Sequence, residues 1–155
     1  MARATTVKDV RGLNAALRRL PKEASAQLRV AAKAIAADIA GEAAERARGL
    51  GGVAGLVAPT IRASKDRVPV VKMGGTGALP DAGSDWTHAR SGPRQTVGDV
   101  IFGAEFGGGA RDTTQQFRPH KGTQGYFLWP TVRDRSDDIQ ERYGEALQDA
   151  LEAIP

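Results

Sequence analysis

The chain contains no cysteine and only two histidines among its 155 residues. The absence of cysteine excludes disulfides and thiolate metal sites, and it fits assembly in a reducing cytosol. His88 and His120 lie in different segments, so the nitrogen and sulfur ligands that a transition-metal site needs are lacking. We therefore expect no metal centre and no bound cofactor.

Long apolar runs are also lacking. Lys33, Asp38 and Glu42 interrupt the alanine-rich part, so no apolar stretch reaches the roughly 18 residues of a membrane span. The first residues do not resemble the apolar region of a secretory signal. We expect a soluble protein that makes no contact with a membrane.

Aromatic residues are few and glycines are many. The sequence has eight aromatic residues and 19 glycines, whereas its apolar fraction of 41% is ordinary for a globular chain. A core built mainly from Ala, Val, Leu and Ile should therefore be small. The length of 155 residues favours one domain that covers the whole chain.

Helical patterns occupy residues from about 8 to 48. A first amphipathic stripe ends at Pro21, and a long segment with eleven alanines follows over residues 22–48 and ends at a glycine cluster. The small alanine side chains should let another element approach closely. The stripe contains Val10, Leu13, Leu17 and Leu20, and the buried face of the long helix should contain Leu28, Ile35 and Ile39.

The middle of the chain, from about residue 53 to 106, predicts strands. The segments VAGLVAPTIRAS and RVPVVKM are rich in β-branched residues, but each contains a proline that favours a sheet edge or a bulge. The segment TVGDVIFGAEFG has apolar residues in alternation, as in a strand with one buried face. That face would contain Val100, Phe102, Ala104 and Phe106.

A final helix is expected over about residues 130–153. Pro130 suits its first turn, and early aspartates suit the positive end of the helix dipole. Three of the eight aromatic residues immediately precede it, so we expect them to hold the helix against the sheet, with Trp129 buried between the two. These residues are Tyr126, Phe127 and Trp129, and the buried helix stripe would be Ile139, Tyr143, Leu147, Leu151 and Ile154.

Two segments show no periodicity, residues 74–95 and 107–125. Irregular segments this long are usually functional or disordered, and we expect both to be mobile in the free subunit. The predicted fold is α+β: a small antiparallel sheet packed against a long N-terminal helix and a C-terminal helix, with two long loops. Neither glycine cluster has the lysine and hydroxyl residue of a phosphate-binding loop, and no catalytic residue is apparent.

Charge is divided unevenly along the chain. Residues 1–73 carry 14 Lys/Arg and 6 Asp/Glu, a net charge of +8, whereas residues 74–155 carry 8 and 12, a net charge of −4. Three interpretations fit this division: weak attraction to nucleic acid, docking of identical subunits through opposite charges, or an ordinary solvated surface.

Three motifs occur in a characteristic order along the chain: RGLNAALRRLP at residues 11–21, Glu-Phe-Gly at residues 105–107, and Phe-Leu-Trp-Pro at residues 127–130. Together they resemble the tail-component family of long-tailed bacteriophages, which is distantly related to minor tail protein Z of lambda-type phages. The resemblance covers nearly the whole chain. The form QFRPHKG…GYFLWPT is similar to the version found in phages or prophages of actinobacteria. The segment GLVAPTIRAS departs from the family, since a proline interrupts the expected first strand.

The resemblance implies a structural protein of the virion, assembled in the bacterial cytoplasm, and not an enzyme. It implies a homo-oligomeric ring, typically sixfold, that connects the head or neck to the tail tube and contacts neighbouring neck and tail proteins. Phage DNA would pass through its lumen without specific binding. The nearest alternative is a tail terminator ring that caps the tail tube. A different class, a basic nucleic-acid-binding module of a mobile element, also remains open.

Contacts between subunits or with partners are expected at and near the motifs that carry this resemblance and on the acidic final helix. The expected residues are Glu105, Phe106, Phe117, Arg118, Tyr126, Trp129, Asp138, Glu145 and Asp149.

Overall fold

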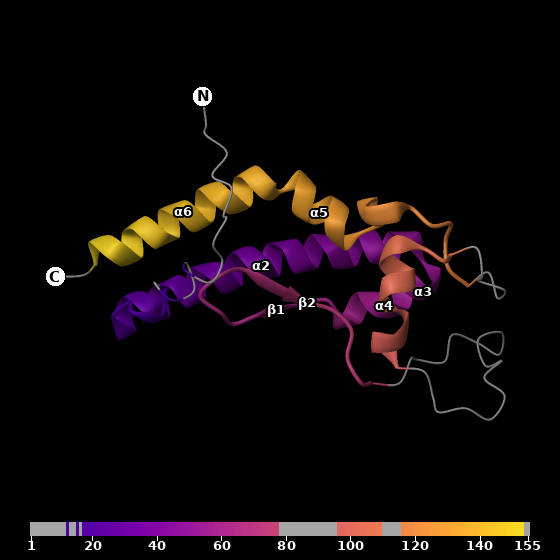
Figure 1. Ribbon diagram of the computed structural model, residues 1–155, viewed down its shortest axis with the longest axis horizontal. Helices are drawn as coiled ribbons and strands as arrows, with labels where there is room; N and C mark the ends of the chain where they lie inside the picture. The colour runs from indigo at the N-terminus through magenta and orange to yellow at the C-terminus, as the bar shows by residue number, and fades with distance from the viewer. Residues whose placement is uncertain (1–11, 13–14, 16, 78–95, 110–115, 154–155) are drawn as a thin grey trace.

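The computed structural model describes residues 12, 15, 17–77, 96–109 and 116–153. One long helix, α2 (Lys22–Leu50), runs through the molecule, and the other elements pack around it (Figure 1). Helices α5 (Leu128–Asp134) and α6 (Ser136–Glu152) lie along one side of α2, and strands β1 (Arg62–Ser64) and β2 (Val70–Lys72) lie along another. Helices α3 (Gly52–Val57) and α4 (Val97–Phe106) cover its C-terminal end.

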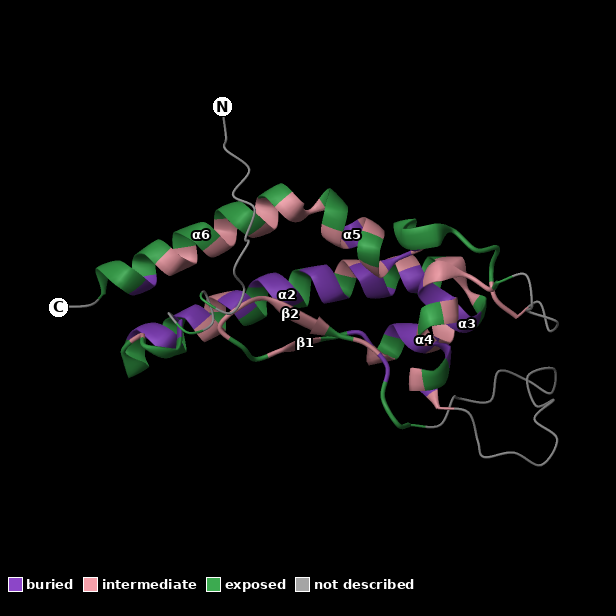
Figure 2. Cartoon of the chain, in the orientation of Figure 1, coloured by how far each residue is buried: buried purple, intermediate pink, exposed green. Residues whose placement is uncertain are grey.

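Helix α2 confirms the long helix expected over residues 22–48. Pro21 precedes its first residue, and Gly51, with a φ of 67°, allows the chain to turn out of the helix at its end. Its buried face includes the three predicted residues Leu28, Ile35 and Ile39. Buried alanines occupy most of the other inward positions, so neighbouring elements approach α2 closely (Figure 2).

The sheet is antiparallel, as predicted, but it consists of two strands of three residues each. Arg62 pairs with Lys72, Ala63 with Val71 and Ser64 with Val70. The fold is therefore α+β, with a much smaller sheet than residues 53–106 would form. Each strand has one neighbour and is therefore an edge strand. Prolines near both strands fit this position, because proline cannot donate a hydrogen bond to a neighbouring strand.

Residues 52–60 are helical, so the prediction of a strand from residue 53 is wrong. Helix α3 buries Val53, Ala54 and Val57, whose spacing matches one helical turn. A 3-10 turn (Ala58–Thr60) follows and contains Pro59 in its first positions. A run this short fits either type of element, and contact with α2 decides between them.

Residues 97–106 form helix α4, so the prediction of a strand here is also wrong. The helix buries Val97, Val100 and Ala104, at spacings of three and four residues. Alternation in the sequence suggested a strand, but Phe102 lies on the exposed side. The overlooked signal was the capping box of Thr96 and Asp99, which marks a helix start.

Acidification should weaken the start of α4. The carboxylate of Asp99 accepts hydrogen bonds of 2.7 Å from the backbone N–H and from the hydroxyl of Thr96, which lowers the pKa of Asp99. The pKa of Asp99 in the folded protein lies below its value of about 4 in the unfolded chain. The ionised carboxylate therefore stabilises the fold above about pH 4, and this stabilisation is lost as the pH falls through the pKa of the folded protein. When the pH is lowered from 7 to 2, the melting temperature of Asp99→Asn should decrease less than that of the parent protein. An equal decrease in both proteins would contradict this assignment.

The predicted final helix is divided at Arg135 into α5 and α6. Its first segment begins at Leu128, so Pro130 lies in the first turn, where backbone N–H groups have no partner within the helix. In α6 the fully buried residue near the end is Ala150, whereas Leu151 is 49% exposed and was wrongly predicted to be buried. Ile139, Tyr143 and Leu147 are half-buried as part of the same inward side, and Ile154 lies outside the described residues.

Two clusters make up the core. The larger one joins the second half of α2 to α3, α4 and Phe127, and the smaller one joins Leu17 and the start of α2 to Ala150 of α6. Val10 and Leu13 of the first predicted stripe lie outside the described residues, as do residues 78–95 of the first predicted loop and residues 110–115 of the second. In the part of the chain that the structure describes, no helix has both the length and the apolarity needed to cross a membrane.

Candidate interaction surface

The residues expected to make contacts form two separate groups in the structure. One group lies around α4, the start of α5 and the segment before it, and contains Glu105, Phe106, Phe117, Arg118, Tyr126 and Trp129. The other group lies on α6 and contains Asp138, Glu145 and Asp149. The two groups differ in chemistry, since the first is aromatic and the second is acidic.

Glu105 forms the centre of the first group, but its side chain is only 1% exposed. Its two carboxylate oxygens accept hydrogen bonds from three consecutive backbone N–H groups, those of Phe127 (3.3 Å), Leu128 (3.0 Å) and Trp129 (2.8 Å). These are the groups that a helix start leaves without a partner. The role of Glu105 is thus internal, to join α4 to α5, and its side chain is not available for a contact with another subunit.

The turn before α5 fits closely around this carboxylate. Gly125 has a φ of 71°, and a Cβ atom at this position would stand 2.2 Å from a carboxylate oxygen of Glu105. Gly107, at the end of α4, has a φ of 86°, and its Cβ would stand 2.3 Å from the carbonyl oxygen of Pro119. The Glu-Phe-Gly motif and the aromatic-proline motif are therefore parts of one packed unit.

The segment between these motifs is also held by polar contacts. The hydroxyl of Tyr126 donates a 2.6 Å hydrogen bond to the carbonyl of Pro119, and the ammonium of Lys121 lies 4.8 Å from the centre of the Tyr126 ring. The backbone N–H of Gly108 donates to the carbonyl of Arg118 at 2.8 Å. Side chains in this region are thus presented on a fixed framework.

Of the aromatic residues that precede and open α5, Phe127 is the buried anchor. Its side chain is 0% exposed within the larger core cluster. Trp129 is 48% exposed, so the expectation that it is buried between the sheet and the final helix is wrong. The three hydrogen bonds to Glu105 fix the backbone of α5 so that Phe127 points inward and Trp129 remains accessible.

An aromatic groove lies on the outer side of α4. Phe102 is 71% exposed, and its ring stacks on that of Phe106 with a centroid distance of 6.4 Å and an angle of 21° between the planes. The groove has a volume of about 530 Å³ and is mainly apolar. Its lining residues are Phe102, Gly103, Phe106, Gly107, Gly109, His120, Gly122 and Thr123. Large exposed aromatic rings of this kind commonly mark a contact with another protein.

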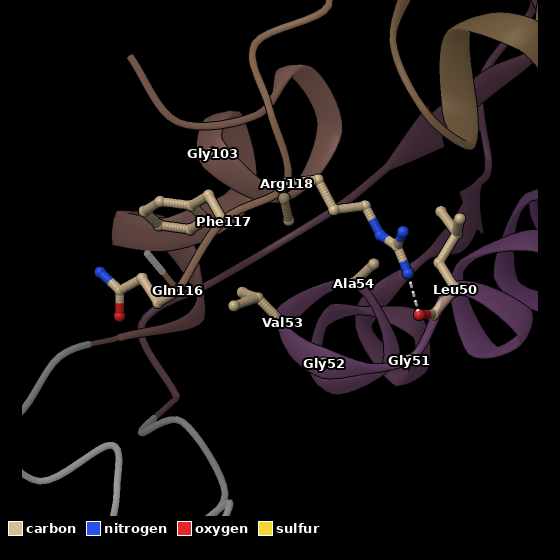
Figure 3. Close-up of a pocket in the computed structure, with 10 residues that line it drawn as sticks. Leu50, Gly51, Gly52, Val53, Ala54, Gly103, Gln116, Phe117 and Arg118 are labelled. Carbon is tan, nitrogen blue, oxygen red and sulfur yellow. Dashed lines mark hydrogen bonds between the residues drawn. The ribbon is translucent and has the colours of Figure 1, made fainter. Parts of the chain in front are cut away.

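A second, smaller hollow of about 190 Å³ lies between the end of α2, α3 and α4 (Figure 3). The guanidinium of Arg118 reaches across it and donates a hydrogen bond to the carbonyl of Leu50. The ring of Phe117 covers Gly103 so closely that a Cβ there would stand 2.5 Å from it. The described residues that line this hollow include no histidine, carboxylate or hydroxyl, so they supply no acid, base or nucleophile.

An ion pair joins the facing sides of α2 and α6, since Arg142 contacts Asp38 at 2.8 Å. Asp138 of α6 forms local ion pairs, with Arg142 at 3.5 Å and with Arg135 at 3.1 Å. The hydrogen bond with Asp38 raises the pKa of Arg142. Asp138 is therefore half-buried and paired within the chain, unlike Glu145 and Asp149, which are exposed.

Among the described residues, no group of three His, Asp or Glu side chains is placed to hold a metal ion. His120 is exposed, and His88 lies outside the described residues. Comparison with protein-family models, with curated proteins and with solved structures found no match.

Proposed function

We propose that the protein is a structural component of a tailed-phage virion that acts by contact with copies of itself and with neighbouring proteins. In this proposal it forms a ring, of about six subunits as in the family that the sequence resembles, at the head–tail junction or in the upper tail. A tail terminator ring is the nearest alternative within the same class. The protein would be assembled in the bacterial cytoplasm and would catalyse no reaction.

Two exposed aromatic rings support this proposal most directly: that of Phe102 in the groove on α4, and that of Trp129 on α5. Phe102 and Trp129 are large apolar side chains that remain exposed although the same chain buries Phe127 completely. They project from α4 and α5, which Glu105 joins rigidly. Rigid aromatic residues lose little conformational freedom on binding, so they are efficient interface residues.

The proposal is tested by imaging the purified full-length protein by negative-stain electron microscopy over a range of concentrations. Closed rings, or tubes of stacked rings, are expected. A protein that remains monomeric at every concentration imaged would contradict the proposal.

Replacing Phe102 or Trp129 by alanine should weaken self-association and leave the fold intact. Truncation of a central interface aromatic costs at least about 2 kcal/mol of binding, or roughly thirtyfold in the dissociation constant. Sedimentation velocity measures the association, and circular dichroism checks the fold. Phe102→Tyr is the matched control, because it keeps the ring and should assemble like the parent. If Phe102→Ala assembles like the parent, the groove is not the contact surface; if Trp129→Ala does so as well, neither exposed ring lies in the contact.

A further inference from the structure

The two sides of the molecule carry opposite charge. Asp138 of α6 is paired with Arg135 and Arg142, whereas the acidic residues on the outer side of the helix are not paired with arginines in the described part of the chain. Among the described residues, no ion pair involves the four exposed acidic residues that we call the acidic stripe. These are Asp137, Glu141, Glu145 and Glu152.

The acidic stripe follows the helical period. Its members are separated by four, four and seven residues, so they lie on one face of α6, opposite the buried Ala150. At 1.5 Å per residue the stripe extends over about 22 Å. Leu151, half exposed, lies beside it. The outer side of α6 therefore presents a row of carboxylates without ion-pair partners among the described residues, with an apolar neighbour; Glu152 accepts a hydrogen bond of 2.8 Å from the side chain of Gln148.

Basic residues occupy the side of α2 that faces away from α6. Lys22, Arg29 and Lys33 are separated by seven and four residues, and by the 3.6-residue period they lie opposite Ala24, which packs toward Ala150 of α6. Two further cations come from the turn between β1 and β2. These two cations, with Lys22 and Arg29, surround a hollow of about 420 Å³, which we call the basic pocket. It is lined by Lys22, Arg29, Lys65 and Arg67 with Ser25, Leu20, Ala26 and Val30.

The charges of the basic pocket lack acidic partners in the described part of the chain. None of its four cations forms an ion pair there, and Nε of Arg29 is buried without a hydrogen-bond acceptor. The guanidinium Nε of Arg67 donates to the hydroxyl of Ser25 at 3.1 Å, which holds this side chain at the rim. A buried donor without an acceptor is rare in a folded protein and requires an explanation.

The neighbouring hairpin adds an unfavourable pair. Arg62 and Lys72 are directly opposite each other in the antiparallel register, and both are exposed. Like charges in this position destabilise a two-stranded sheet. Such an arrangement is expected where an anionic partner offsets the repulsion.

We propose that the basic pocket receives the acidic stripe of α6 from a second copy of this chain. The inference rests on the proposed function, because it identifies the contact by which copies would join side by side. The two surfaces lie on opposite sides of α2, so the contact is heterologous and repeats from one subunit to the next. Each copy would offer both partners of the contact.

The composition of the pocket favours a protein partner over nucleic acid. Leu20, Ala26 and Val30 form apolar walls, with Val30 67% exposed, and they match Leu151 beside the acidic stripe. The described residues of the pocket include no aromatic ring on which a base could stack. The match is therefore between two helices, each with a charged row and an apolar neighbour.

A charge exchange tests the contact. One variant carries Lys22→Glu and Lys65→Glu in the pocket, and the other carries Glu141→Lys and Glu145→Lys on the stripe; all four positions are exposed, so both proteins should fold. Each exposed ion pair contributes up to about fivefold to an association constant, and reversal adds repulsion to the loss of attraction, so reversal of two should weaken self-association of either variant by about tenfold. Mixing the two variants should restore assembly, because each reversed surface then meets its complement. Salt at 1 M, where the Debye length is about 3 Å, should weaken assembly of the parent.

Sedimentation velocity and negative-stain microscopy give separate readouts. Rings that persist in both variants would overturn the charge contact and leave the proposed function standing. Open filaments that respond to the charge exchange would support the contact and contradict a ring. A parent protein that stays monomeric and binds a short DNA duplex with steep salt dependence, lost in the Lys22→Glu/Lys65→Glu variant, would overturn the inference in favour of a phosphate-binding surface.

Discussion

Replacement of Phe127 by alanine should lower the free energy of unfolding by about 3–5 kcal/mol. The side chain is the largest one that is completely buried, and it packs in the cluster that joins α2 to α3 and α4. Its removal leaves a cavity where the chain enters α5. A domain of this size has a total stability of roughly 5–15 kcal/mol, so the variant should be largely unfolded at moderate urea concentrations.

Urea denaturation followed by circular dichroism measures this effect. Phe102→Ala is the matched control, because the same truncation at a ring 71% exposed should change stability by less than about 0.5 kcal/mol. Trp129→Ala should lie between the two, since this ring is half exposed. If Phe127→Ala were as stable as the parent, the packing of the larger core cluster would have to be reconsidered.

Replacement of Glu105 by alanine should destabilise the protein by about 2–5 kcal/mol. The change removes the only carboxylate that the backbone N–H groups of Phe127, Leu128 and Trp129 contact in the structure. Three donors at the start of α5 then lie without an acceptor next to the core. Glu105→Gln should cost less, about 1–3 kcal/mol, because the amide retains one oxygen acceptor and places an NH₂ group against the remaining donors.

Hydrogen exchange gives a local readout for the same variants. The amides of residues 127–129 should lose protection in Glu105→Ala before the amides in the middle of α2 do. Glu45→Ala, at an exposed position of α2, is the control and should leave the protection of both sets of amides unchanged. Unchanged stability and unchanged protection in Glu105→Ala would show that the carboxylate does not hold α4 and α5 together.

Buried residues and exposed residues should affect different properties of this protein. Phe127 and Glu105 are buried, so their loss should reduce stability and, through it, assembly. Phe102 and the acidic stripe are exposed, so their loss should reduce assembly alone. Substitutions at buried positions and substitutions at exposed positions, measured together, therefore distinguish a protein that fails to fold from one that folds but fails to associate.

The long helix α2 was predictable from the sequence by itself. Its alanines, its apolar period and the glycines after it are local signals, and local signals suffice when a helix is long and strongly patterned. The α+β class and the strand over Val70–Lys72 were also predicted correctly. The division of charge between the two halves of the chain is a property of the sequence too.

Tertiary contacts decided the elements whose patterns are ambiguous. Residues 97–106 fit two apolar patterns. Val100, Phe102, Ala104 and Phe106 alternate as in a strand, whereas Val97, Val100 and Ala104 are spaced as on one face of a helix. The second pattern prevails because α4 packs against α3 and the end of α2 with those three residues buried. Ten residues are too few for periodicity alone to separate the two structures.

Side-chain roles at the candidate surface depended on the tertiary structure even more. Adjacent aromatic residues have similar hydrophobicity, so the sequence could not distinguish the buried Phe127 from the exposed Trp129. Three hydrogen bonds from the backbone to Glu105, a residue more than 20 positions earlier, set their directions. In the same way, the packing of α6 on α2 pairs Arg142 with Asp38, whereas Glu145 has no ion-pair partner among the described residues. Composition determines how much charge and apolar surface a chain has, but contacts between distant residues determine which part remains available to a partner.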